Sequence, residues 1–296
     1  MKISNQEIPD HGGPRFSRDD SPSSDVPAFQ QMVLLHYEKF GRDMAWRNTT
    51  DPYKILVSEI MLQQTQVKRV TTKFPEFIDA FPDFPTLSAA PLSEVLAVWQ
   101  GMGYNRRVIT LQKCATRVMN EYNGILPADT GILATFPGIG KATASSIAAF
   151  AFNTPVVFIE TNIRRVFIHF FFSDTETVND AQILPLVEKT LYRQNPRVWY
   201  WALMDLGSAL KKTIPNPNRR SIHYVKQSPF EGSDRNIRGI ILRMLLAEPG
   251  IREEKLQLIR KDDPARITRI LSVLEHEGFI HKNNDGIFLY DVNKSY

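Results

Sequence analysis

A chain of 296 residues with 43% hydrophobic content is long enough for one large domain or two domains of ordinary size. Its formal net charge of +4 permits binding to a polyanion. A single cysteine, Cys114, excludes an internal disulfide framework and any all-cysteine metal site. The sequence has no apolar run long enough for a membrane helix and no signal-peptide core, so we expect a soluble, unsecreted protein.

The first 27 residues are polar and predict a disordered leader. Residues 28–210 follow as a series of amphipathic helical segments separated by Pro, Gly and Asn, which predicts a mostly α domain. The segment TPVVFIETNIRRVFIHFFF is rich in strand-forming residues, but Ile163, Val166, Phe167 and Phe170 have helical spacing. We therefore expect an extended segment up to Glu160 and then a helix, with Thr161 or Asn162 as its N-cap.

Residues 211–232 predict a linker, and KKTIPNPNRRSIHYVK within them holds five Lys or Arg and no acid. Such a run is typical of a solvated linker, and its uncompensated charge also suits phosphate contacts. Residues 233–291 predict three helices and then a β-hairpin around Asn284, Asp285 and Gly286. This order is the layout of a winged helix.

The stretch FPGIGKATA places Gly138 and Gly140 between two helical segments. We expect both glycines to allow positive φ and a close backbone approach. The free N–H groups at the start of the next helix would suit a phosphate oxygen, and Lys141 adds a positive charge there. The alternative is an ordinary glycine-bearing turn between helices.

Two carboxyl groups stand out. In SEIMLQQTQV, Glu59, Gln63 and Gln66 would share one helix face. This polar stripe indicates either solvent exposure or a cleft in which the carboxyl acts as an acid. Glu160 would lie at a helix N-terminus, either as a simple cap or as a catalytic carboxylate. Two carboxyls in different environments are what cleavage of a glycosidic bond requires.

The stretch WQGMGYNRR holds further candidates. Gly101 and Gly103 would bring the backbone close to a partner, and Tyr104 offers a ring for stacking or for packing. Arg106 and Arg107 supply positive charge.

Together, PGIGKATA with Glu160 twenty residues beyond Gly140, WRNTTDPYKILVSEIMLQQTQV and WQGMGY resemble the helix–hairpin–helix DNA glycosylases, in particular the MutY-type adenine glycosylases. The resemblance covers about residues 29–210. It implies an all-α, two-lobed helix–hairpin–helix DNA glycosylase fold with a base-flipping pocket, here followed by a C-terminal winged-helix-like domain.

The resemblance also implies roles for individual residues. Glu59 matches the general acid that protonates the leaving purine, and Glu160 matches a carboxylate that stabilises the sugar cation. Asn162 matches an active-site asparagine. The DNA contacts are expected from a wedge at Gln63, from Tyr104 beside the opposite base, and from the phosphate-binding turn. The full set of expected DNA-binding residues is Gln63, Gln64, Tyr104, Arg106, Gly138, Gly140, Lys141, Arg219 and Arg220.

Three departures from the family pattern are visible. Glu160 stands where an aspartate is usual, and Ala142 stands where strand-nicking relatives have a nucleophilic lysine. The four positions of the family's iron–sulfur cysteines fall on Lys211, Asn218, Ser221 and Gln227, which cannot be thiolate ligands. We therefore expect no cluster, and phosphate contacts from the basic stretch instead. The family's Nudix-like domain is replaced by the winged-helix-like region.

The sequence thus predicts a monofunctional glycosylase that removes a mispaired base, with adenine opposite guanine or 8-oxoguanine as the leading candidate. Alternatives are a glycosylase for uracil, thymine or another damaged base, and a catalytically silent module that binds DNA structure. Double-stranded DNA is the expected partner of a cytoplasmic, nucleoid-associated monomer. No metal ligand set is expected, although a monovalent or divalent cation could bind the hairpin at residues 136–140.

Overall fold

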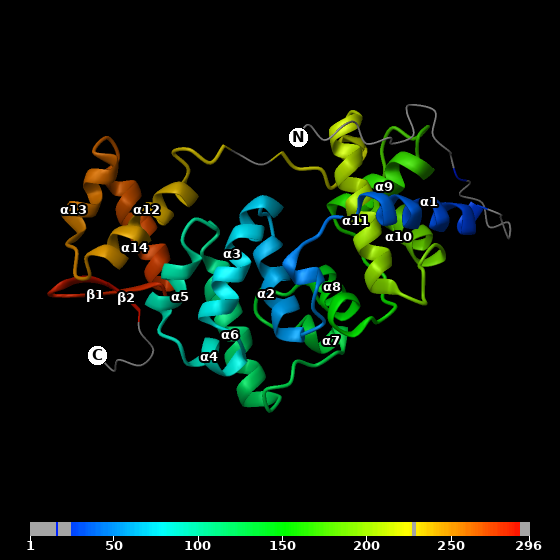
Figure 1. The fold of residues 1–296 in the computed structure, drawn as a ribbon. Helices are drawn as coiled ribbons and strands as arrows, with labels where there is room; N and C mark the ends of the chain where they lie inside the picture. The colour runs from blue at the N-terminus through cyan, green and yellow to red at the C-terminus, as the bar shows by residue number, and fades with distance from the viewer. Residues whose placement is uncertain (1–15, 17–24, 227–228, 291–296) are drawn as a thin grey trace, which may run out of the picture. The chain divides into compact units, whose positions relative to one another are not determined.

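The computed structural model describes residue 16, residues 25–226 and residues 229–290, and it is mostly helical (Figure 1). The chain divides into two compact units. Unit 1 comprises Met1–Ile55, Ala128–Thr135 and Ile139–Lys226; unit 2 comprises Leu56–Pro127, Phe136–Gly138 and Gln227–Tyr296. These boundaries differ from the sequence prediction, because the 28–210 region contributes to both units and the region after residue 232 belongs to unit 2.

Unit 1 is built on one aromatic-rich core, in which α11 packs against both α9 and α1. The rings of Phe29, Phe167, Phe171 and Trp199 lie at its centre. Its elements are α1 (Asp25–Phe40), η1 (Ala45–Arg47), the first turn of α2 (Pro52–Leu62), α7 (Thr130–Leu133), α8 (Lys141–Phe152), α9 (Thr161–Phe171), α10 (Asp180–Lys189), α11 (Pro196–Thr213) and η2 (Pro217–Arg220).

The predicted leader of 27 residues is too long. Helix α1 begins at Asp25, and Phe16 is buried with its ring against Phe29 and Phe171. The Phe16 N–H donates to the carbonyl of Phe170 at 3.2 Å, so this residue is anchored in the core of unit 1. Burial of this large aromatic side chain explains why the residue is anchored. The polar composition of the segment as a whole gives no sign of it. Residues 1–15 and 17–24 lie outside the described part of the chain.

A buried ion cluster joins α11 to the segment between α1 and α2. Asp205 on α11 is 3% exposed and accepts hydrogen bonds from Arg47 at 2.8 Å to each carboxylate oxygen. The Arg42 side chain and its backbone N–H donate to the same carboxylate, each at 2.8 Å. Burial alone would raise the pKa of Asp205, but the bonds to Arg47 and Arg42 outweigh it and hold the pKa below its usual range.

Unit 2 joins a helical lobe to the C-terminal elements. In the lobe, α6 packs against α4 and α5, and α3 packs against α5. Its elements are the rest of α2, α3 (Val67–Ala80), α4 (Phe84–Ala89), α5 (Leu92–Trp99), α6 (Arg106–Glu121), α12 (Asp234–Ala247), α13 (Glu253–Gln257), η3 (Leu258–Arg260), α14 (Pro264–His276), β1 (Ile280–Asn283) and β2 (Gly286–Leu289).

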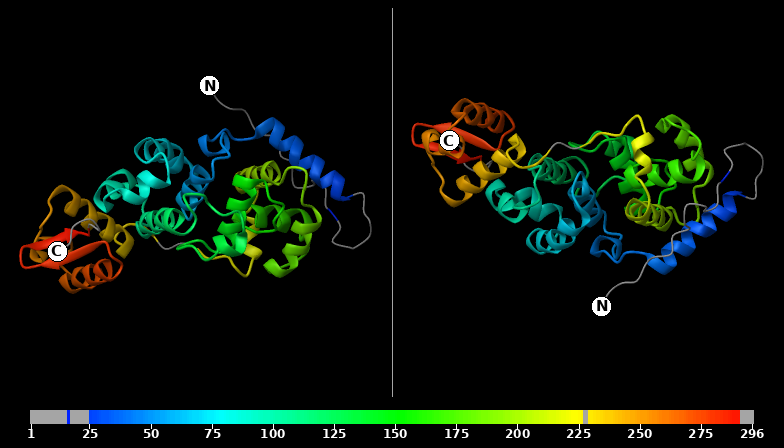
Figure 2. Two further views of the ribbon diagram at one scale, coloured as in Figure 1. Left: turned by 90° about the horizontal axis from the view of Figure 1, so that it is seen from below. Right: turned by 90° about the horizontal axis from the view of Figure 1, so that it is seen from above.

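The C-terminal elements follow the predicted order of three helices and a hairpin. Strands β1 and β2 pair antiparallel with Asn283 opposite Gly286, and α12 and α14 pack against them (Figure 2). Gly286 has φ of 141°, and an added Cβ would lie 2.3 Å from the Gly250 carbonyl oxygen, so only glycine fits this turn. The winged-helix reading of this layout stays an interpretation. Among the described residues, none of the helices has the length and hydropathy needed to cross a bilayer.

We predict that Asp205→Asn lowers the free energy of unfolding by about 3–5 kcal/mol, because the buried Arg47 loses its counterion. Since the folded pKa of Asp205 is lowered, its contribution to stability is present at neutral pH and is lost as the pH falls through that lowered pKa. Urea titrations of the variant and of the exposed control Glu188→Gln would measure both effects. A loss no larger than that of the control contradicts the role of the cluster.

Candidate active site

Two loops meet at the buried guanidinium of Arg107, at the start of α6. One is the turn between α2 and α3 at residues 63–66, called here the wedge turn, and the other is the QGMGY loop at residues 100–104. The three nitrogens of this guanidinium donate to six backbone carbonyl oxygens at 2.6–3.4 Å; the acceptors are Ile60, Met61, Gln63, Met102, Gly103 and Tyr104. Burial lowers the pKa of Arg107 to about 10, which still leaves it charged at neutral pH. One cation therefore supplies donors that neither loop could provide for itself.

These contacts correct the predicted polar helix face. Helix α2 ends at Leu62, Gln64 has φ of 52°, and the next helix starts at Val67, so Glu59 does not share a helix with Gln63 or Gln66. The Arg107 guanidinium satisfies the last carbonyls of α2 and so allows the helix to stop there. Glu59 is partly exposed on the last turns of α2, and Gln64 and Gln66 are exposed in the turn that follows.

The QGMGY loop turns on residues with left-handed backbone. Gly101, Gly103 and Tyr104 have φ of 84°, 68° and 47°. An added Cβ at either glycine would meet nothing within 4 Å in the protein, so inside the chain the glycines are needed for their backbone angles, and the close approach to a partner stays a prediction. The Tyr104 hydroxyl accepts a hydrogen bond from Arg235 of α12, whose guanidinium also lies 5.1 Å from the ring centroid.

The turn of the FPGIG stretch lies between α7 and α8, as expected for a helix–hairpin–helix. Gly138 has φ of 69°, and an added Cβ would lie 3.0 Å from Thr110 Oγ1. Gly140 has an ordinary φ of −85° with open space around it, so positive φ was wrongly expected there. Gly140 is the N-cap of α8, and among the described residues no side chain caps this helix. Gln63 Nε2 donates to the Gly138 carbonyl at 3.2 Å, which links the wedge turn to the hairpin.

Glu160 is itself the N-cap of α9, in place of the predicted Thr161 or Asn162. Its Oε1 accepts the N–H groups of Asn162 at 2.7 Å and Ile163 at 2.9 Å, because a glutamate at this position reaches both free donors of the helix. Burial raises the pKa of Glu160, opposed by these two N–H groups and by the charges of Arg165 and Arg164. Glu160 therefore combines the predicted cap with a perturbed carboxyl.

Asn162 connects Glu160 to the helix behind it. Its Nδ2 donates to Glu160 Oε2 at 3.2 Å, and its Oδ1 accepts from Arg165 Nη1 at 2.7 Å. The same nitrogen of Arg165 donates to the Gly207 carbonyl of α11, also at 2.7 Å. A Cβ at Gly207 would lie 2.3 Å from the Asn162 carbonyl oxygen, so this glycine lets α11 approach the start of α9 closely.

Known proteins are similar to this chain in sequence and in fold. Residues 57–187 match the HhH-GPD superfamily base excision DNA repair protein family. An adenine DNA glycosylase of Mycolicibacterium smegmatis is 30% identical over 274 residues, which cover 86% of this chain and 94% of that protein. The chain belongs to this HhH-GPD superfamily.

Two further similar proteins match this chain over a shorter region. An adenine DNA glycosylase of Buchnera aphidicola is 37% identical over 187 residues, 62% of this chain, and this chain spans about half of that relative's length, 52%. The solved structure of a thermostable thymine-DNA glycosylase aligns with a TM-score of 0.55 and 25% identity, over 62% of this chain and 86% of that one.

The residues at the superfamily's cluster positions do not fit an iron–sulfur cluster. Asn218 is 3% exposed, and its Nδ2 donates to the Thr161 carbonyl at 2.8 Å. The backbone of Ser221 pairs with Val178, and its Oγ accepts the N–H of His223. Lys211 is exposed in the last turn of α11, and Gln227 lies outside the described residues. The predicted linker therefore begins as helix and then packs on unit 1 as far as Ser221.

The predicted DNA-binding cations differ in their surroundings. Lys141 and Arg219 are exposed. Arg106 is exposed as well and forms an ion pair with Glu277. Arg220 has a structural role, because its guanidinium donates to carbonyls that follow α9, including those of Phe172 and Thr175. Its contact with DNA stays a prediction, as does the cation at residues 136–140.

Sequence reasoning missed four important residues. Arg107 was seen only as a charge, while Arg165, Gly207 and Asp205 were not singled out. The signal for Arg107 was its place directly after the QGMGY loop, where several carbonyls lack partners. Gly207 in the middle of the helical stretch ALMDLGSAL was the clearest signal, because glycine weakens a helix interior unless close packing requires it.

We predict that Arg107→Met lowers the free energy of unfolding by about 3 kcal/mol or more, because several carbonyls lose a charged donor. The variant should also bind duplex DNA more weakly, since Gln63 and Tyr104 lose their common support. Chemical unfolding and fluorescence anisotropy would measure the two effects. The matched control is Lys113→Met, an exposed position on the same helix. Equal stability of the two variants would refute the role of Arg107.

Proposed function

We propose that this chain is a monofunctional DNA glycosylase of base excision repair that removes adenine mispaired with guanine or 8-oxoguanine. The observation that supports it most is the perturbed carboxyl of Glu160 at the start of α9, in a chain of the HhH-GPD superfamily that retains Glu59. Its relatives in Mycolicibacterium and Buchnera are named adenine DNA glycosylases. Cleavage of an N-glycosidic bond needs two carboxyls with different roles.

In this mechanism Glu59 protonates the base that leaves, so that the bond to the sugar breaks with a neutral leaving group. Ionised Glu160 stabilises the positive charge that develops on the sugar and directs the attacking water. Asn162 positions Glu160 through its hydrogen bond to Oε2. Arg165 fixes Asn162 in turn and connects the pair to the backbone of α11.

Several groups of the chain are assigned to DNA binding. The uncapped N–H groups at the start of α8 and the Lys141 charge bind a phosphate. Gln63 enters the base stack, Gln64 contacts the DNA beside it, and Tyr104 lies beside the base opposite the target. Arg106 and Arg219 add phosphate contacts. The partner is a duplex with a mismatch or a damaged base, bound by a monomer in the cytoplasm at the nucleoid.

The proposal includes neither strand cleavage nor an iron–sulfur cluster. Ala142 lies exposed in the first turn of α8 and offers no amine for a covalent intermediate. The chain's one cysteine, Cys114, is fully buried in unit 2, and its thiol donates to the Pro137 carbonyl at 3.3 Å. Cys114 therefore has a packing role in the core of unit 2.

A second candidate is a mismatch glycosylase for thymine or uracil. Glu160 is one methylene longer than the usual aspartate, and a shift of about 1 Å at the sugar can change a rate by about 100-fold. The structural likeness to a thymine-DNA glycosylase favours this candidate over other bases.

The test is base release from duplexes with adenine opposite 8-oxoguanine, adenine opposite guanine, uracil opposite guanine and thymine opposite guanine. We expect excision of adenine, detected as strand scission only after alkali treatment. Glu59→Gln and Glu160→Gln should each lower the single-turnover rate by 100-fold or more, roughly the range of general acid and electrostatic catalysis. Binding without release of any base would instead indicate a silent DNA-binding module.

The pH dependence tests the state of Glu160. Catalysis needs the ionised carboxyl, and burial raises its pKa, so kcat/KM should fall on the acid side at a higher pH than for a glutamate with the ordinary value of 4.5. The residual activity of Glu160→Gln should lack this acidic limb. For stability the sign is opposite to that of Asp205, because a raised carboxyl pKa favours the folded state when the group is protonated. An unchanged limb in Glu160→Gln would assign it to another group.

A further inference from the structure

The buried carboxyl group of Glu277 joins the C-terminal elements of unit 2 to its helical lobe. Glu277 is the C-cap of α14, and its side chain is 10% exposed. Its Oε1 accepts a hydrogen bond from Arg106 at the start of α6, and its Oε2 accepts one from Arg238 of α12. Burial would raise the pKa of Glu277, but the bonds from Arg238 and Arg106 outweigh it and hold the pKa below its usual range. The group is therefore an ionised carboxylate at neutral pH.

The two arginines hold this carboxylate from different surroundings. The side chain of Arg238 is 18% exposed, and its guanidinium lies 5.6 Å from the ring centroid of Phe279. A second nitrogen of Arg238 lies 3.4 Å from Glu277 Oε1, so Arg238 alone has donors for both oxygens. The side chain of Arg106, in contrast, is 70% exposed. Arg238 is therefore packed among the C-terminal elements, whereas Arg106 reaches the same carboxylate from the solvent side.

Arg106 can exchange Glu277 for another anion at little cost. Arginine binds carboxylate and phosphate oxygens in the same way. Removing one partner of a buried ion pair is costly when it leaves a charge unpaired, but Glu277 keeps the two donors of Arg238. The exposed contact to Arg106 itself contributes little to stability. In the free protein, Glu277 thus occupies the guanidinium that the proposed function assigns to a DNA phosphate.

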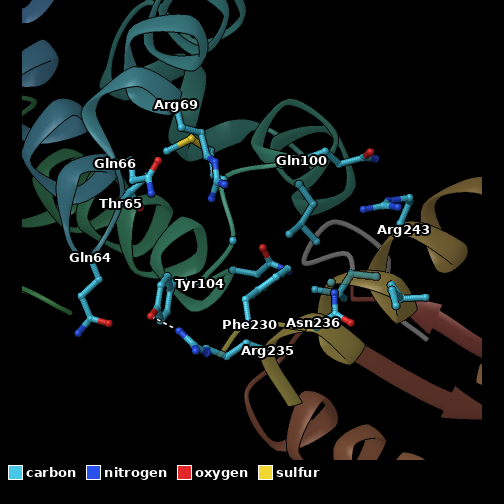
Figure 3. Close-up of a pocket in the computed structure, with 18 of the residues that line it drawn as sticks. Gln64, Thr65, Gln66, Arg69, Gln100, Tyr104, Phe230, Arg235, Asn236 and Arg243 are labelled. Carbon is cyan, nitrogen blue, oxygen red and sulfur yellow. Dashed lines mark hydrogen bonds between the residues drawn. The ribbon is translucent and has the colours of Figure 1, made fainter. Parts of the chain in front are cut away.

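A second contact of α12 involves another residue assigned to DNA binding, Tyr104. Arg235 donates to the Tyr104 hydroxyl, drawn as a dashed line in Figure 3, and its guanidinium lies 5.1 Å from the ring centroid. Arg235 and Arg238 are three residues apart, so they lie on one face of α12. This face and the end of α14 therefore contact Tyr104 and Arg106, which are two positions apart in the chain.

We infer that Glu277 is an internal competitor for DNA: its carboxylate takes the place of a phosphate at Arg106 and weakens the binding of any duplex. The inference rests on the proposed function for the phosphate contact of Arg106. A competitor in the same chain has a high effective concentration, so one weak contact is enough to compete with each phosphate that approaches. Because phosphate contacts carry no sequence information, the competition acts mainly on undamaged DNA, which offers by far the most sites. The protein thereby leaves DNA without a substrate more readily.

The test measures binding of the full chain to an undamaged duplex by fluorescence anisotropy. Glu277→Gln removes the charge that competes for Arg106, and we expect it to bind about two- to fivefold more tightly than the wild type, the range of an exposed ion pair. Glu275→Gln is the matched control, because it removes the same charge from an exposed position of α14. Its affinity for the duplex should stay close to that of the wild type.

A double-mutant cycle with Arg106→Gln separates competition from a general effect of charge. Without Arg106 the carboxylate has no phosphate-binding group to block, so Glu277→Gln should leave the affinity unchanged. An affinity that Glu277→Gln does not raise, or raises equally without Arg106, would overturn the inference. Thermal unfolding would show whether the variants are folded. If Glu277→Gln is not, the same criteria apply to Glu277→Asp, which keeps a counterion for Arg238 but is one methylene too short to reach both arginines.

Base release from the mismatched duplexes separates this inference from the proposed function. Release of adenine, together with an affinity that does not respond to Glu277→Gln, would reject the competition and keep the function. A gain in affinity that requires Arg106, without release of any base, would reject the function and keep the competition.

Discussion

The hydrogen bonds of Arg107 are the interaction on which unit 2 depends. Two loops with left-handed residues, one after α2 and one after α5, expose backbone carbonyls to the interior, where unpaired polar groups are costly. A single planar cation satisfies both sets of carbonyls at once, which a lysine with its compact charge could not do. The wedge turn and the ring of Tyr104 thereby share one support, so a change in either loop is transmitted to the other.

In unit 1, side-chain hydrogen bonds fix the start of α9. The start of α9 is fixed by a relay from Glu160 through Asn162 and Arg165 to the backbone of α11. The segment after α11 adds Asn218, which bonds the Thr161 carbonyl, and Asn216, which accepts from Arg165 at 3.2 Å. Polar side chains of this segment therefore stabilise the start of α9. The chain has a single cysteine, too few for an iron–sulfur cluster.

Local patterns predicted much of the fold. The spacing of Ile163, Val166 and Phe167 identified α9 against strand propensity, and turn residues located the β1–β2 hairpin. The prediction that Glu59 and Gln63 share one helix face was wrong because Arg107, more than forty positions away, allows α2 to end before Gln63. No local sequence pattern indicates such a contact. The N-cap of α9 was predicted one or two residues too late, at Thr161 or Asn162, because a glutamate is an uncommon cap. Phe16 escaped notice since one aromatic residue hardly changes the composition of a polar segment.

The buried state of Cys114 has a practical consequence. Cys114 lies on α6 with its thiol fully buried in unit 2, and burial raises the pKa of this thiol to about 12, so it holds almost no thiolate at neutral pH and is poorly reactive. The native chain is therefore nearly silent toward maleimide and similar reagents. A cysteine introduced at an exposed position would therefore be the one site that a maleimide dye labels in the folded chain, so DNA binding could be followed by fluorescence without first replacing Cys114.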